Sequence, residues 1–211
     1  MTKICWICQK NLADSGEHSV KHSDLRNAFT KGKKLFLHTR TLINKKVSGT
    51  NSKELKPVKI CSDCNNRMLQ PYDMAWQAFA DAHANNGSPD TDILLLPPEE
   101  KLKIQLFFVA KLGCFLKEAN VAIDLSSFSC ALLNKTAHPN IYIKILSSRP
   151  SEIGRSDLEK IEYAGQIVCL VIQYNVMGIS AQIIYALPSE ANREGVVTAS
   201  IKPSDLKGVK L

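Results

Sequence analysis

Apolar residues recur at helical spacing in two long stretches of the chain. In the first stretch a single apolar stripe at i, i+4, i+7 and i+11 is formed by Tyr72, Trp76, Phe79 and His83. This stripe predicts a helix after Cys64, which Pro71 either begins or kinks. The second stretch, 104–116, is apolar on more than one face, which predicts a central buried helix beginning at the Pro-Pro-Glu-Glu segment 97–100.

Short apolar runs between polar turns predict strands. Strands are expected at 35–38, 57–60, 140–146, 166–174 and 179–187, and short helices within 23–34 and 128–133. The turn-forming segment 85–89 then divides the chain into residues 1–88 and residues 89–211. The pattern favours an α+β fold in which residues 89–211 combine a buried helix with antiparallel strands.

Charge is distributed unevenly between these two parts. Residues 1–88 contain 14 Lys and Arg against 7 Asp and Glu, whereas residues 89–211 contain 13 of each kind. Excess positive charge is typical of a part that binds a polyanion, although a solvated lysine-rich surface is the alternative. Residues 89–211 show no catalytic grouping, and we interpret their polar side chains as surface.

The composition excludes several classes of protein. Hydrophobic residues make up 45% and charged residues 22% of the chain, which is usual for a globular protein. No apolar run approaches the ~20 residues that cross a bilayer, and the first residues lack a signal-peptide stretch. We therefore expect a soluble, cytoplasmic protein that is not bound to a membrane.

Four of the seven cysteines form two C-x2-C pairs, Cys5/Cys8 and Cys61/Cys64. Four thiolates suit one tetrahedral structural zinc ion, whereas a redox site would need only one such pair. Two such knuckles, a long connection and a helix after the second are the outline of a treble-clef zinc module. The remaining cysteines are expected as small core residues, namely Cys114, Cys130 and Cys169.

Glu17-His18 lies between the two knuckles, and Asn65 follows Cys64 directly. With the cysteine pairs, these residues resemble the HNH, or ββα-metal, endonucleases in their zinc-stapled, endonuclease VII-like form. The resemblance covers residues 4–80, about a third of the chain. It implies a zinc-stapled ββα-metal module within residues 1–88, followed by an α+β domain of unknown role at 89–211.

The resemblance also implies a role for each motif residue. His18 is expected to be the general base, since histidine titrates near neutral pH. Glu17 and Asn65 are expected to bind a catalytic Mg²⁺ or Mn²⁺ ion, because such hard cations prefer oxygen ligands. Asn51 is the candidate for ordering the loop between the strands.

Basic residues near the motif are expected to contact the nucleic-acid backbone; they are Lys21, Lys33, Lys34, Lys45, Lys46 and Arg67. The sequence thus predicts metal-dependent hydrolysis of nucleic-acid phosphodiesters, with DNA favoured over RNA.

Each motif residue also has a structural alternative. Glu17-His18 could be a polar turn, Asn65 could cap a helix, and His22 is expected at the surface. Two other functions stay open: a zinc module that binds nucleic acid without cleaving it, and an interaction or homodimerisation platform formed by residues 89–211.

Overall fold

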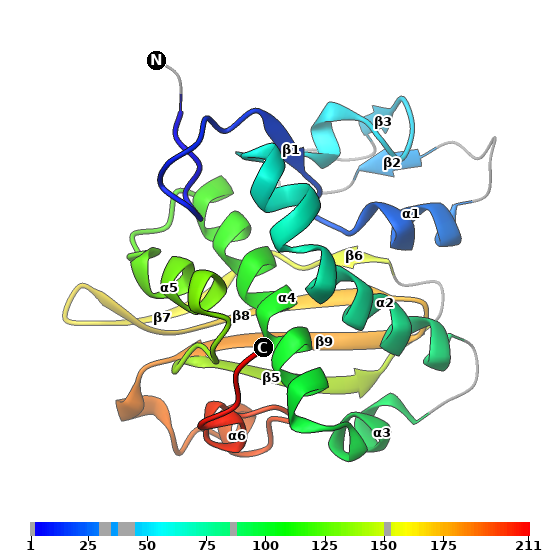
Figure 1. Cartoon of the computed structure of the whole chain (residues 1–211). Helices are drawn as coiled ribbons and strands as arrows, with labels where there is room; N and C mark the ends of the chain where they lie inside the picture. The colour runs from blue at the N-terminus through cyan, green and yellow to red at the C-terminus, as the bar shows by residue number, and fades with distance from the viewer. Residues whose placement is uncertain (1–2, 30–34, 38–44, 85–87, 150–152) are drawn as a thin grey trace.

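The computed structural model describes residues 3–29, 35–37, 45–84, 88–149 and 153–211 (Figure 1). Two short strands pair in its first part, β1 (Ser15–Glu17) and β4 (Val58–Ile60), which run antiparallel with Ser15 opposite Ile60. Between them lie α1 (His22–Ala28), the antiparallel pair β2 (Leu35–Leu37) and β3 (Lys45–Val47), and the 3-10 helix η1 (Lys53–Leu55). After β4 the chain forms a π-helical turn, η2 (Cys64–Met68), and then α2 (Gln70–His83).

In the second part, a group of helices precedes one antiparallel sheet. The helices are α3 (Pro89–Leu95), α4 (Pro98–Glu118) and α5 (Ser126–Asn134). The sheet has the order β5 (Ile141–Ser147), β9 (Ile179–Ala186), β8 (Gln166–Val176) and β6 (Gly154–Arg155), and β7 (Glu159–Tyr163) also pairs with β8. The chain ends with η3 (Pro188–Glu190), α6 (Glu194–Val197) and η4 (Pro203–Leu206).

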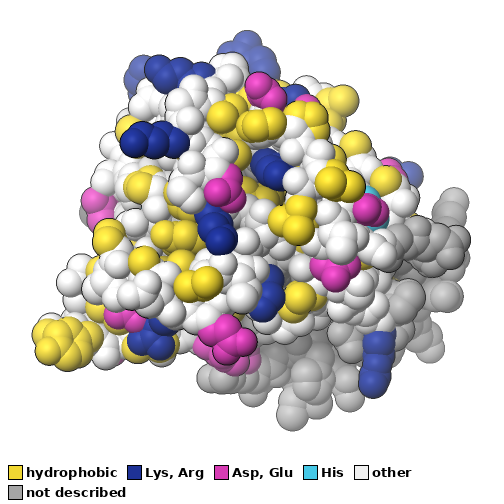
Figure 2. All heavy atoms as spheres, turned by 90° about the horizontal axis from the view of Figure 1, so that it is seen from below, with side chains coloured by type: hydrophobic (Ala, Val, Ile, Leu, Met, Phe, Trp, Pro, Cys, Tyr) yellow, Lys and Arg dark blue, Asp and Glu magenta, His cyan; other side chains and the backbone are white. Residues whose placement is uncertain are grey.

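Helices α2 and α4 lie side by side over one face of this sheet (Figure 1). In the second half of β8, from Leu170 to Val176, buried positions alternate with half-buried ones, as the period of two in a strand predicts, whereas the four residues 167–170 are all buried. Figure 2 shows the molecule from below, where hydrophobic side chains are interspersed with charged ones, as on an ordinary solvent-facing surface.

An aromatic cluster joins the two parts of the chain. The ring of Trp76 on α2 stacks on Phe107 of α4 with centroids 5.5 Å apart, and it meets Phe108 and Tyr174 edge-on. Buried hydrophobic residues from both 1–88 and 89–211 therefore belong to one continuous cluster. The division at residue 88 marks the change in net charge, and the hydrophobic core runs across it.

The predicted mixture of helices and antiparallel strands is confirmed. Helix α4 is buried along most of its length, and Pro71 lies in the first turn of α2, after the π-helical turn. Strands β5, β8 and β9 agree with the expected ranges to within two residues. Among the described residues, no helix combines the length and hydrophobicity that a bilayer crossing needs.

Two interpretations of the second part are wrong. Its polar residues are not all at the surface, since Gln105, Lys111 and His138 are buried. Gln105 is accommodated because its amide bonds the backbone of the 138–141 turn, with Nε2 2.8 Å from the Ile141 carbonyl oxygen. Cys130 is exposed and not a core residue, because it lies on the outer side of α5.

Acid is expected to destabilise the protein through His138. Burial lowers the pKa of His138 to about 4, against 6.5 for an exposed histidine. The unfolded chain takes up the proton first, so the free energy of unfolding falls as the pH drops below 6.5, by about 2 kcal/mol at pH 5 from this group. Urea unfolding at pH 7 and pH 5 should show a smaller loss for His138→Gln than for wild type; equal losses would contradict this role.

Candidate functional site

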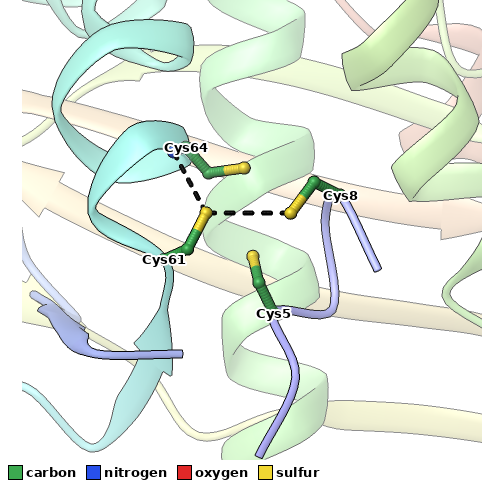
Figure 3. Close-up of side chains that lie close together, drawn as sticks. All are labelled: Cys5, Cys8, Cys61 and Cys64. Atoms are coloured by element: carbon green, nitrogen blue, oxygen red, sulfur yellow. Dashed lines mark hydrogen bonds between the residues drawn. The ribbon is translucent and has the colours of Figure 1, made fainter. Parts of the chain in front are cut away.

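The four paired cysteines converge on one point (Figure 3). Cys5 and Cys8 come from the loop before β1, Cys61 follows β4, and Cys64 begins η2. All four sulfur atoms lie within 4.8 Å of one another, and those of Cys8 and Cys61 are 3.7 Å apart. Tetrahedral zinc with Zn–S bonds of ~2.3 Å needs sulfur atoms about 3.8 Å apart. The cluster could therefore hold a metal ion such as zinc.

Backbone hydrogen bonds shape both knuckles around this point. In the first, the Gln9 amide donates to the Cys5 carbonyl at 2.9 Å, and in the second the Cys64 amide donates to the Cys61 sulfur at 3.4 Å. Burial opposes ionisation of Cys8, but backbone N–H groups of Asn11 and Lys10 lower the pKa of its thiol to about 7. Such donors favour the thiolate, which is the form that binds metal.

The first knuckle is docked onto the helices of the second part. Trp6, between the two cysteines, lies against α4 at Gly113, where an added Cβ would fall 2.4 Å from the indole ring. Only glycine permits this approach. The Ser129 hydroxyl of α5 donates to the Ile7 carbonyl. These contacts fix the cysteine cluster relative to α4.

A pocket of about 440 Å³ lies beside the cluster, where β1 ends. Its lining includes five of the predicted site residues, Glu17, His18, Lys21, Asn51 and Asn65. The pairing of β1 with β4 sets Ser15 opposite Ile60, just before the second knuckle, and the Asn65 Nδ2 donates to the Ser15 hydroxyl at 2.7 Å. Residues 48 positions apart in the chain, Glu17 and Asn65, thus line the same pocket.

His18 is held in one tautomer by the backbone. Its Nε2 lies 3.2 Å from the Thr50 carbonyl oxygen, which can only accept a hydrogen bond. Nε2 therefore carries the proton, and Nδ1 keeps its lone pair. Burial, followed by the charges of Lys56, His22 and Lys111, lowers the pKa of His18 to about 4, below the near-neutral value that the sequence analysis expected, so its ring is neutral at pH 7.

The expectation that His22 is a surface residue is wrong. Its ring is half-buried at the pocket and stacks on His18, with centroids 4.8 Å apart and an interplanar angle of 12°. Its Nε2 lies 3.3 Å from the Thr50 hydroxyl. Thr50 therefore contacts both imidazoles. The loop residue that contacts the histidines is thus one position before the predicted Asn51. Asn51 itself is exposed at the rim of the pocket.

Two pocket residues, Lys111 and Asp73, were missed by the sequence analysis. Lys111 Nζ donates to Glu17 Oε1 and, at 3.0 Å, to the His18 carbonyl. Its side chain is 3% exposed; burial lowers its pKa, but the carboxylates of Glu17 and Asp73 outweigh this and hold the pKa above its usual range. The available signal was a lysine inside the apolar stretch 104–116. Asp73, near the start of α2, carries no comparable signal.

The predicted nucleic-acid contacts lie in different environments. Lys21 is engaged within the protein, because its Nζ donates to the Asp73 carbonyl at 2.6 Å and to Gln77 Oε1 at 3.0 Å. Lys45 and Lys46 are exposed on β3. Arg67 is exposed but pairs with Asp63 at 2.6 Å and does not line the pocket. Lys33 and Lys34 lie outside the described residues.

Comparison of the chain with protein-family models, with curated proteins and with solved structures gives no match in any of the three.

Removal of one cysteine ligand is expected to release the metal and unfold the first part. Structural zinc contributes ~10–16 kcal/mol of apparent folding free energy in small zinc modules at neutral pH. Purified protein should contain one zinc ion per chain, and Cys61→Ser should lose it and melt at a much lower temperature. Elemental analysis and thermal unfolding measure both.

The matched control is Cys130→Ser, which removes an exposed cysteine outside the cluster. This variant should keep the zinc content and melting temperature of wild type. Wild type without zinc, or Cys61→Ser with full zinc and unchanged stability, would contradict the assignment.

Proposed function

We propose that this protein is a metal-dependent endonuclease of the HNH type, with a zinc-stapled treble-clef module as its catalytic part. The observation that carries the proposal is that Glu17, His18 and Asn65 line one pocket beside the four-cysteine cluster. A histidine can supply the base, and an acid and an amide oxygen can supply the cation ligands, for metal-assisted phosphodiester hydrolysis.

His18 acts as the general base in this proposal. Its ring is neutral at pH 7, and the Thr50 carbonyl holds the proton on Nε2, so the lone pair of Nδ1 is free to accept a proton. As the oxygen of water bonds to phosphorus, Nδ1 takes the water proton and one P–O ester bond breaks. The backbone contact keeps the imidazole oriented while it accepts this proton.

The oxygen atoms of Glu17 and Asn65 suit a hard divalent cation. The Nδ2 of Asn65 donates to the Ser15 hydroxyl, and its Oδ1 is the atom that would bind the cation. Glu17 offers the carboxylate oxygen that Lys111 does not bind. These residues would hold Mg²⁺ or Mn²⁺. When bound, the cation would neutralise the negative charge that develops on the leaving oxygen.

The charge distribution supports a nucleic-acid substrate, and DNA is the substrate that we propose. Residues 1–88 carry seven excess positive charges, and Lys45 and Lys46 are exposed on the same part. Backbone phosphates would release counterions on binding these lysines, so affinity should fall steeply with salt.

A second candidate is a zinc module that binds nucleic acid without cleaving it. The ion pair between Lys111 and Glu17 favours this alternative, because an ammonium already neutralises the carboxylate that would bind the catalytic cation. A homodimer or partner platform formed by residues 89–211 is the third proposal, and a concentration-dependent mass would support it.

Replacement of the base is expected to abolish most of the activity. With Mg²⁺ or Mn²⁺ the wild type should nick plasmid DNA, and His18→Ala should lose ~10²-fold or more in rate while it keeps its zinc and its affinity for DNA. The measurement is single-turnover cleavage together with zinc content and a binding titration.

His83→Ala is the matched control, because His83 pairs with Asp92 at the other end of α2 and does not line the pocket. It should cleave as wild type does. Salt-dependent DNA binding with no cleavage under any divalent ion would favour the non-catalytic alternative, and equal rates for wild type and His18→Ala would remove His18 from the role.

A further inference from the structure

Lys111 is a charged residue in an environment that disfavours charge. It lies in the middle of α4, between residues that are almost wholly buried, and its own side chain is 3% exposed. An ammonium group at such a position is strongly unfavourable unless close partners compensate it. Its partners are therefore the reason that a lysine is tolerated there.

These partners belong to the candidate catalytic site. Nζ donates to Glu17 Oε1 and to the His18 carbonyl, and it lies 5.4 Å from the centroid of the Phe107 ring. Glu17 is itself 12% exposed, so the ion pair is shielded from water on both sides. Lys111 also lines the pocket, which places a fixed positive charge next to the carboxylate proposed as a cation ligand.

We propose that the Lys111 ammonium is a built-in counter-cation at the candidate metal site, which shares Glu17 with the divalent cation and thereby weakens cation binding. The inference rests on the proposed function for its assignment of Glu17 as a cation ligand. The ammonium compensates Glu17 when no metal is present. The Lys111 ammonium repels a divalent cation that binds the same carboxylate.

Coulomb repulsion at such short range is large in a partly buried pocket, where water screens it less than at an open surface. Asp73 is the other carboxylate at the pocket, and it also faces Lys111. The phosphate of a bound nucleic acid would add the negative charge that favours the cation. The site would accordingly bind its cation tightly only together with the substrate.

The test is calorimetric titration of Mn²⁺ into full-length, zinc-loaded protein without nucleic acid. Lys111→Met removes the charge and keeps a side chain of similar length, so Mn²⁺ should bind about tenfold tighter or more than to wild type. Lys103→Met is the matched control, because Lys103 is on the same helix but pairs with Glu100 and does not line the pocket. Its Mn²⁺ affinity should equal that of wild type.

Lys111→Gln provides a second variant, because its amide still donates hydrogen bonds to Glu17 and His18 without the charge. This variant should also bind Mn²⁺ more tightly than wild type does. It keeps the test possible if Lys111→Met does not fold. Unchanged or weaker binding in the folded variants would overturn the proposal. Failure of both variants to fold would also overturn it, in favour of a purely structural ion pair.

The two proposals fail separately in this experiment when cleavage is measured on the same samples. Tighter Mn²⁺ binding by the Lys111 variants without cleavage by any protein would leave the role of Lys111 standing and refute the nuclease. Cleavage by wild type, with the same Mn²⁺ affinity in wild type and the Lys111 variants, would refute the counter-cation and leave the nuclease standing.

Discussion

The closure of two distant C-x2-C pairs onto one point is the constraint on which the site depends. The pairs are separated by more than 50 residues, and their sulfur atoms nevertheless lie within 4.8 Å of one another. Closing so long a loop costs conformational entropy, and the pairing of the three-residue strands β1 and β4 does not offset this cost alone. A metal ion bound by the four sulfurs would keep β1 paired with β4, and Glu17 and His18 in the same pocket as Asn65.

The second part of the chain completes the pocket. Trp6 of the first knuckle lies against Gly113 of α4, and Lys111, two residues earlier in the same helix, reaches Glu17. One helix thus supports the cysteine cluster and supplies a charge to the pocket. This arrangement explains why the hydrophobic core is continuous across residue 88, although the excess positive charge is confined to the first part.

Local patterns predicted the cysteine cluster, the buried helix and the main strands, because spacing and periodicity reflect interactions between near neighbours. The neighbours of Glu17 could not be predicted in this way. Lys111 is 94 positions from Glu17, and only tertiary packing of α4 brings them together. The same holds for Thr50, which contacts His18 although it lies 32 positions away in the chain. The metal-binding and catalytic roles themselves remain predictions.

The central claim is that a divalent cation binds in the pocket between Glu17, His18 and Asn65. Paramagnetic broadening of histidine ring signals by Mn²⁺ tests it directly, because the effect falls off steeply with distance from the ion. In zinc-loaded protein with a DNA oligonucleotide, Mn²⁺ should broaden the signals of His18 and His22, while those of His83 and His138, which do not line the pocket, stay sharp. Equal broadening of all four, or none at saturating Mn²⁺, would contradict the account.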